Sequence, residues 1–432
     1  MLSPTEQKQS AEGIIGREPS VRRSFLGLNS ILWRIAIITG ISQFSVSVWA
    51  WEFALFLEPI LDPFRIGLTF SAGTFAALLG YPIAGAISDL FGRKNTLIAS
   101  YIPQFIGLII LFTYPIWPLV PLAYGIHSFG WSFVIMISRA MPADEIVQLT
   151  DPNSSRLFTM VLLPSFLIDG ISPIAAVMLL NLGLTVNILL LVGALTTFAS
   201  MILSFIFVKE TLKESIENTK KEPHIPLRQL GQSFWKFTVG MIGYTLAWGM
   251  TIPYYGILCV GEWGVSLEFY GLTWSAFSLA TVLVMYSVSG FTGKHLKRVM
   301  TFGLLSNALI MISLGVGTGP WLLLLLNIIW AVPIIIWITA ERMLSINGVP
   351  NEMKGRALGV YQLVMSITGL IAAPIGAWLW VLFGSQRVLW VISGILATAF
   401  TLVVWKTVPK VKSNQNLKKD ITKKQLSQAI SQ

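Results

Sequence analysis

The stretch GAISDLFGRKNTL, residues 85–97, separates two long apolar runs and carries the charged residues Asp89, Arg93 and Lys94. The flanking runs, 68–90 and 95–115, are each long enough to cross a bilayer, which takes about 20 mostly apolar residues. Gly92 permits a tight turn, and charged side chains at a membrane edge keep contact with water. The stretch therefore predicts a short hairpin between two membrane-spanning helices.

The whole chain has the same character. Of its 432 residues, 54% are hydrophobic and only 12% are charged, whereas soluble proteins carry roughly 25% charged residues. This composition excludes an ordinary soluble protein. The apolar segments that could span a membrane are 34–58, 68–90, 95–115, 117–139, 157–180, 186–208, 237–260, 269–291, 299–317, 319–341, 356–382 and 386–408.

A polar stretch divides these twelve segments six and six. The sequence thus predicts an all-α membrane protein in which two six-helix bundles are joined by a linker. Its expected parts are a cytoplasmic N-terminal tail 1–33, a bundle 34–208, a cytoplasmic linker 209–236, a bundle 237–408 and a cytoplasmic C-terminal tail 409–432.

The basic residues predict the orientation of the spans. With both termini in the cytoplasm, 28 of the 30 Lys and Arg residues fall on the cytoplasmic side, and Arg65 and Arg387 are the exceptions. This agrees with the positive-inside rule. The net charge of +10 then reflects topology, because it is scattered over many cytoplasmic segments and forms no nucleic-acid patch. We expect a multi-pass protein of the cell membrane, in contact with lipid and not with nucleic acid.

The hairpin sequence resembles the loop 2–3 signature of the major facilitator superfamily (MFS), G-x-x-x-D-x-x-G-R-[RK]. It lies at a predicted span boundary and on the predicted cytoplasmic side. Internal repetition supports the resemblance: Arg156 and Arg356 are 200 residues apart, and Pro173 and Pro374 are 201 apart. A degenerate second copy of the hairpin motif follows the eighth span, with Gly290, Lys294 and Arg298 at an offset of 205 from Gly85, Asp89 and Arg93.

The resemblance implies the MFS fold, with two pseudo-symmetric bundles that expose a central site to each side in turn. It also implies a cytoplasmic gate, in which Asp89 meets the start of the eleventh span and Arg93 joins an ion-pair network. We add Asp144, Glu145 and Arg156 of the loop between spans four and five as candidate members of that network. The expected gate residues are Gly85, Asp89, Gly92, Arg93, Lys94, Arg156, Glu341 and Arg356.

Two family elements are absent. The glycine-flanked Gly-Pro pair of antiporters is Ser172-Pro173 here, and the acidic-Gly-Tyr-acidic element of many metabolite symporters is missing near Ser47-Val48-Trp49. Symport of a metabolite is preferred over drug or metabolite efflux by antiport. A non-transporting membrane sensor with the same fold remains the alternative from another class.

Polar residues in apolar helices face protein or a water-filled cavity, because exposure to hydrocarbon is costly. Spans one, four, seven and ten each carry a polar stripe at helical spacing. Packing between helices is the competing explanation for each stripe. The predicted cavity residues are Ser45, Trp49, Tyr124, Ser128, Trp131, Tyr244, Trp248, Thr251, Tyr255, Asn327, Trp330 and Trp337.

Two carboxyl groups lie well inside predicted spans, those of Glu52 and Asp169. A low-dielectric environment disfavours the charged form of a carboxyl group, which suits it to taking up and releasing a proton. Proton coupling is therefore expected at Glu52 and Asp169, with permanent pairing as the structural alternative. His127 could relay a proton or form part of the wall.

No Lys or Arg lies in the interior of a predicted span, because those within the bounds stand at or near a span end. A cavity without a fixed cation favours neutral, amphipathic or cationic solutes, such as a sugar or another metabolite, over phosphates and dicarboxylates. The single cysteine, Cys259, and three histidines predict neither a metal site nor a cofactor. No nucleophile–base constellation predicts an enzyme, and no P-loop predicts an ATP-driven pump. We expect a monomeric secondary transporter.

Overall fold

The computed structural model describes residues 27–149, 154–212, 230–288, 295–346, 349 and 353–408. Most of the predicted tail 1–33, most of the linker 209–236 and all of the tail 409–432 lie outside the described residues. The first bundle consists of α2 (Ser30–Ser47), η2 (Ala50–Glu52), α3 (Phe53–Leu57), α4 (Pro63–Phe91), α5 (Arg93–Thr113), α6 (Leu119–Leu149), α7 (Ser154–Asn181) and α8 (Val186–Phe207). The second consists of α9 (Gln232–Gly249), η4 (Ile252–Tyr254), η5 (Ile257–Glu262), α10 (Leu267–Val288), α11 (Leu296–Val316), α12 (Pro320–Ser345), α13 (Lys354–Phe383) and α14 (Gln386–Thr407).

The predicted layout of twelve spans is confirmed. In the described part of the chain, 11 helices are long and apolar enough to cross a membrane. The remaining span, the seventh, is made of α9, η4 and η5 in series, because the helix is interrupted after Gly249. The first span, α2 to α3, is interrupted in the same way after Ser47.

The predicted end of the fourth span, at residue 139, is wrong by ten residues, because α6 continues to Leu149. Hydropathy falls where charged residues begin, but the helix continues as an amphipathic extension. Its side chains Met141 and Ile146 are buried in the same cluster as Leu28 and Leu157. Arg139 consequently lies inside a helix and not in a loop.

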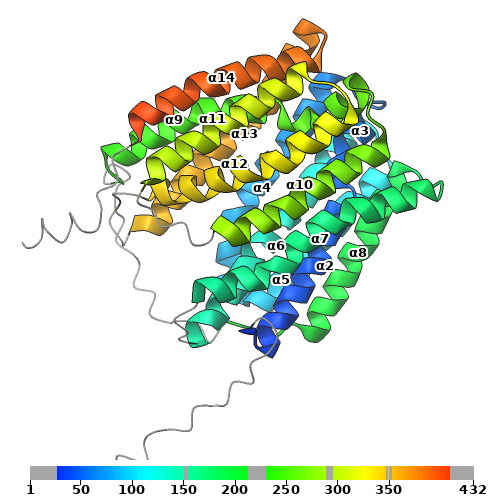
Figure 1. Ribbon diagram of the computed structural model, residues 1–432. Coiled ribbons are helices and arrows are strands. Elements are labelled where there is room, and N and C mark those ends of the chain that lie inside the picture. Colours follow the sequence, from blue (N-terminus) through cyan, green and yellow to red (C-terminus); the bar gives the residue numbers. More distant parts are fainter. Residues whose placement is uncertain are drawn as a thin grey trace, which may run out of the picture.

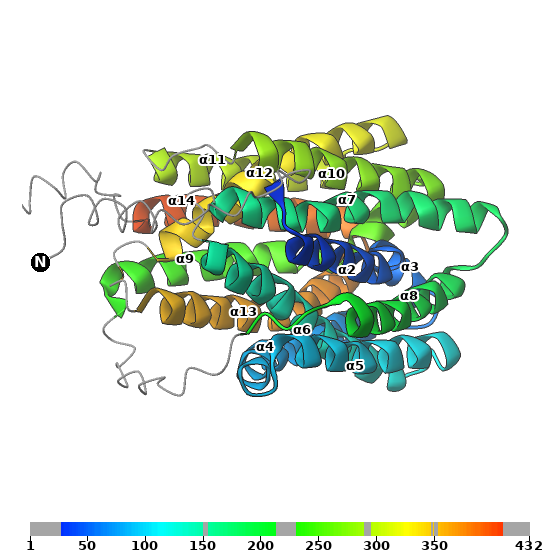
Figure 2. The same cartoon turned by 90° about the horizontal axis from the view of Figure 1, so that it is seen from below.

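The two bundles repeat the same packing (Figures 1 and 2). In the first, α2 packs on α7 and α8, while α5 lies against α6 and α8. In the second, α9 packs on α13 and α14, while α11 lies against α12 and α14. The bundles meet along two helix pairs, α4 with α13 and α7 with α10. These pairs are spans two and eleven, and spans five and eight, as expected of pseudo-symmetric halves.

Close helix packing depends on glycine at specific positions. A Cβ atom on Gly107 of α5 would lie 2.5 Å from the carbonyl oxygen of Ala123 in α6. Small residues allow this close approach of backbones, which strengthens van der Waals packing in a membrane.

The two ends of the molecule differ. We call the end with Ser30, Arg93 and Thr407 the basic end, and the end with Leu57 and Gly384 the opposite end. Hydrogen bonds join the halves from Ser71 Oγ to the Leu370 carbonyl at 2.6 Å and from Tyr270 Oη to the Trp51 carbonyl at 3.2 Å. Both lie between the middle of the helices and the opposite end. In Figure 1 the bundles diverge from there toward the basic end.

Candidate functional site

The first and seventh spans break at equivalent positions, 202 residues apart. At the first break, Val48 N donates to the Phe44 carbonyl at 3.1 Å and Glu52 N donates to the Trp49 carbonyl at 3.1 Å. At the second, Met250 N donates to the Leu246 carbonyl at 3.1 Å and Tyr254 N donates to the Thr251 carbonyl at 3.0 Å. The residues that leave the helix, Trp49 and Thr251, have φ angles of −127° and −110°. The two halves therefore carry the same irregular backbone.

Both breaks line one cavity of about 270 Å³, which we call the central cavity. It lies where the two halves meet, because its walls come from α2, η2, α3, α4 and α7 of one half and from η4, α10 and neighbouring residues of the other. Its aromatic walls suit the faces of rings and apolar groups. The lining residues are Gln43, Val46, Ser47, Ala50, Trp51, Ala54, Phe70, Asp169, Ile252, Pro253, Tyr255, Gly256, Tyr270 and Trp274.

A second cavity of about 290 Å³, the inner cavity, lies within the first half between α2, α6 and α7. It shares Gln43 and Asp169 with the central cavity. These two side chains therefore stand at the boundary between the cavities. The inner cavity is lined by Thr39, Gln43, Trp131, Val134, Ile135, Ser138, Arg139, Leu162, Ser165, Phe166 and Asp169.

Asp169 of α7 is held by donors from both halves. Gln43 Nε2 donates to its Oδ1 at 3.1 Å, and Ser47 Oγ donates to the same oxygen. Ser278 Oγ, on α10 of the other half, donates to Oδ2 at 3.0 Å. A carboxyl oxygen can accept more than one such bond. Asp169 thus links the halves at the cavity.

Glu52 has the contrasting environment. Its side chain is fully buried, and neither carboxyl oxygen has a hydrogen-bond partner among the described residues. Burying a carboxylate without partners is costly, and binding a proton removes that charge. The two carboxyl groups predicted to couple protons therefore have different surroundings. Glu52 is buried and has no hydrogen-bond partner in the described part of the chain, whereas Asp169 accepts three hydrogen bonds.

His127, the third residue predicted to take part in coupling, lies inside the first half. Its ring packs edge-on to Trp49, with centroids 5.2 Å apart, and Nδ1 lies 3.5 Å from the Gln104 carbonyl. It lines neither of the two cavities.

Of the twelve predicted cavity residues, Trp131 lines the inner cavity and Tyr255 lines the central cavity. The others pack within their own halves. Tyr124 packs against Trp49, Ser45 Oγ donates to the Ser42 carbonyl at 2.7 Å, and Ser128 lies beside Gly73. In the second half, the remaining side chains form an aromatic and hydrogen-bonded cluster of Tyr244, Trp248, Thr251, Asn327, Trp330 and Trp337.

Comparisons with known proteins agree with this architecture. The fold matches a variant of the nucleoside transporter NupG at a TM-score of 0.77 and 11% identity, covering 88% of this chain and 100% of that one. It matches a D-xylose-proton symporter at 0.70 and 15% identity, with 89% and 98% coverage. It also matches the human organic anion transporter MFSD10 at 0.63 and 13% identity, with 87% and 99% coverage. No curated protein matches by sequence.

Residues 237–431 match the family model of the Major Facilitator Superfamily. The second half of the chain is therefore similar to this superfamily in sequence, and the whole chain is similar in fold to the matched transporters. The matched structures carry chemically different cargoes, so this MFS fold leaves the solute to be argued from the residues of the cavities.

The predicted MFS gate lies at the basic end. Arg93 binds Asp89 at 2.6 Å and Asp144 at 3.1 Å, and the Asp89 side chain is 64% exposed. Gly92 has φ of +89°, which favours glycine. Glu210 accepts hydrogen bonds from the backbone N–H groups of Arg93 and Lys94, both at 3.0 Å. Glu210 thereby caps the start of α5, where Gly92 offers no side chain.

The other predicted gate residues are spread around this end. Gly85 of α4 faces Met136 of α6, and Glu341 accepts a hydrogen bond from Tyr361 Oη. Glu145, assigned to the network, accepts instead from Asn29 Nδ2 at 2.6 Å. Arg156 and Arg356 lie in the first turns of α7 and α13, and the side chain of Arg156 lies outside the described residues.

The sequence analysis did not single out Gln43, Ser47, Arg139 or Ser278, which surround Asp169 or line its cavities. Helical spacing could have identified Gln43 and Ser47. Together with Thr39 they recur every four residues and form a second polar face on α2.

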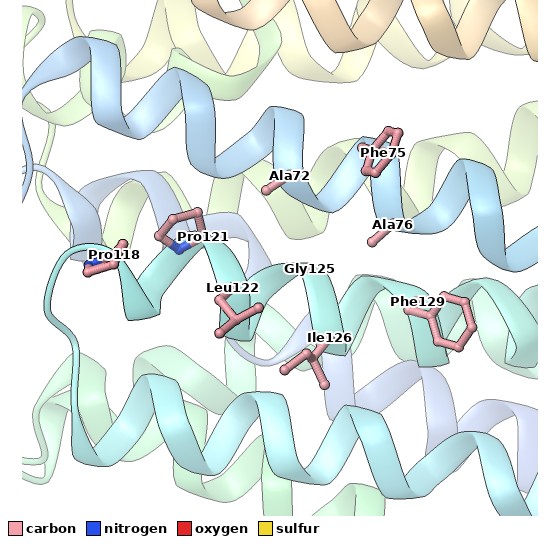
Figure 3. Close-up of a pocket in the computed structure, with 9 residues that line it drawn as sticks. All are labelled: Ala72, Phe75, Ala76, Pro118, Pro121, Leu122, Gly125, Ile126 and Phe129. Atoms are coloured by element: carbon pink, nitrogen blue, oxygen red, sulfur yellow. The ribbon is translucent and has the colours of Figure 1, made fainter.

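A larger groove of about 510 Å³ lies outside this site, between α4 and α6 (Figure 3). Its nine lining residues are all apolar, and Ala76 and Gly125 bring the two helices close together. Phe75 and Leu122 are 49% and 58% exposed. The groove offers no polar side chain to a solute, so the central and inner cavities are the candidate site.

Proposed function

We propose that the protein is a secondary active transporter that moves a small organic solute across the membrane by alternating access, in symport with protons. The observation that carries the proposal is the central cavity, which lies where the two halves meet and is lined by one interrupted helix from each. Irregular backbone at membrane depth is tolerated where it is buried in protein or lines a cavity. In transporters, paired interruptions of this kind mark the site for substrate and coupling ion.

The arrangement of the halves supports one of the two access states. The inner cavity leads from Asp169 toward Arg139 and the basic end, while the Tyr270–Trp51 hydrogen bond ties the halves on the side of the opposite end. If the basic residues mark the cytoplasm, this state is open inward, with both termini inside a cell membrane.

Glu52 is the proposed proton carrier. It lies at the break of the first span, next to Trp51 of the central cavity wall, and its oxygens lack partners among the described residues. A change in the distance between the halves would change its access to water. Asp169, with its three donors, is the proposed link between solute and helix movement.

The test is a solute screen in proteoliposomes with an imposed pH gradient, in which proton flux is read by a pH-sensitive dye. Solute and proton should enter together; opposite directions would establish antiport, and no flux with any solute would favour a sensor. Glu52→Gln should abolish accumulation against a gradient and preserve counterflow. Glu58→Gln, six residues along and exposed, is the matched control. Unchanged accumulation by Glu52→Gln would refute the coupling role.

A further inference from the structure

The inner cavity contains a fixed cation, Arg139, that the sequence analysis had placed at the cytoplasmic end of the fourth span. Arg139 lies ten residues before the end of α6 and lines the same cavity as Asp169. The cavity therefore offers one positive and one negative side chain, together with the hydroxyl groups of Thr39, Ser138 and Ser165.

Arg139 forms no ion pair or hydrogen bond with another described residue. Its charged and titratable neighbours are Tyr81 on α4 and Arg342 on α12 of the other half, besides Asp169 in the shared cavity. A second arginine increases the local positive potential and does not neutralise it. Arg139 is thus available to an anionic group, and a guanidinium binds a carboxylate through paired hydrogen bonds.

Asp169 provides the opposite pole. Its two oxygens accept bonds from Gln43, Ser47 and Ser278, and a carboxylate has about four acceptor positions. One position therefore remains for a donor on the solute. An ammonium group satisfies it best, because it brings a positive charge as well as N–H bonds.

We infer that the transported solute is a small zwitterion, whose carboxylate binds Arg139 and whose ammonium group binds Asp169. A purely anionic solute meets the Asp169 carboxylate, and a purely cationic one meets Arg139. The remaining wall is formed by Trp131, Val134, Ile135, Leu162 and Phe166, which suit an apolar side chain. A volume of about 290 Å³ is at the small end of ligand pockets, roughly 300–1,000 Å³.

That the zwitterion is transported rests on the proposed function, whereas its binding can be measured without transport. Cys259 is the single cysteine and is buried, so a thiol-reactive fluorogenic dye reports unfolding of the detergent-solubilised protein. A ligand that binds the folded protein and not the unfolded one raises the unfolding temperature, and the rise grows with the ratio of ligand concentration to Kd. The probes are L-leucine, its methyl ester, which is only cationic, and N-acetyl-L-leucine, which is only anionic.

The wild type should be stabilised by leucine and not by the two derivatives. Arg139→Gln should weaken leucine binding by about 10- to 150-fold, the loss of one hydrogen bond to a charged group, and should improve binding of the methyl ester. Asp169→Asn should improve binding of N-acetyl-leucine. Arg34→Gln, which removes a cation at the same end but lines neither cavity, should bind as the wild type does.

A series from glycine through β-alanine and γ-aminobutyrate to longer homologues then reports the spacing of the two poles by its optimum. Equal binding of leucine and its ester, no binding of any zwitterion, or an unchanged preference in Arg139→Gln would overturn the assignment. If zwitterions bind but show no counterflow in proteoliposomes, the ligand class holds and transport fails. If another solute is transported by Arg139→Gln as by the wild type, transport holds and the zwitterion assignment fails.

Discussion

The hydrogen bond between Ser278 and Asp169 is expected to favour the state in which the halves are closed toward the opposite end. It joins α10 to α7 at 3.0 Å, near the middle of both helices. A net hydrogen bond to a charged group is worth roughly 1.5–3 kcal/mol. Water can replace Ser278 once the halves separate, and Gln43 and Ser47 stay with Asp169 in their own half, so the lower value applies. Ser278→Ala should therefore increase the population open to the opposite end by about tenfold.

The assay uses a cysteine that reacts only in that state. Ala54 lines the central cavity and is 5% exposed, so Ala54→Cys in a Cys259→Ala background provides the reporter. A membrane-impermeant maleimide applied from the opposite end labels it at a rate proportional to the open population, provided that opening is faster than labelling. The labelling rate should rise about tenfold with Ser278→Ala.

Ser287→Ala is the matched control. It removes a hydroxyl from the same helix, but this hydroxyl is bonded to the Leu283 carbonyl of α10 itself at 3.0 Å. Its labelling rate should stay at the parent value. In Asp169→Asn, adding Ser278→Ala should have a smaller effect, because residues that share a bond are not additive. Equal rates for the two serine variants, or a lower rate for Ser278→Ala, would refute the reasoning.

Two further predictions concern the basic end. Glu210→Ala removes the carboxylate that caps α5. The loss of this cap should destabilise the start of the helix by about 1–2 kcal/mol, which is measured as faster hydrogen exchange confined to the first turn of α5. Lys209→Ala should leave that exchange unchanged. Asp89→Asn removes an exposed pair with Arg93, so thermal stability should change little. The cysteine-accessibility balance between the two ends should nevertheless shift, because the proposed gate uses Asp89 when the basic end closes. An unshifted balance would exclude the gating role.

Hydropathy predicted the helices well because hydrocarbon constrains length and composition strongly. It failed at the end of α6, because a helix can continue into water once its apolar side packs on protein, as Met141 does. That failure also removed Arg139 from the predicted site. The boundary drawn from composition thus placed Arg139 at the membrane edge, although its side chain lines the inner cavity.

The polar stripes were less informative for a different physical reason. Ser42 of α2 bonds the Tyr101 hydroxyl at 2.6 Å, inside the first half, whereas Gln43 faces Asp169. Both faces of the helix are polar because both contact protein, and burial in protein satisfies a hydroxyl as well as a cavity does. Helical periodicity identifies the faces that avoid lipid, but it cannot tell which of these faces lines a cavity.

The paired helix breaks could be predicted neither from hydropathy nor from helical periodicity. Pro253 follows the second break, and a proline is an ordinary cause of an interrupted helix. The first break has Trp51 at the equivalent position, 202 residues earlier, and no proline in its span. Yet Trp49 N and Thr251 N make the same bond, to the carbonyls of Val46 and Trp248, both at 3.2 Å. A local cause in one half cannot produce the same backbone in the other. What the two segments share is their place on the wall of the central cavity, which makes that cavity, and not the proline, the feature common to both interruptions.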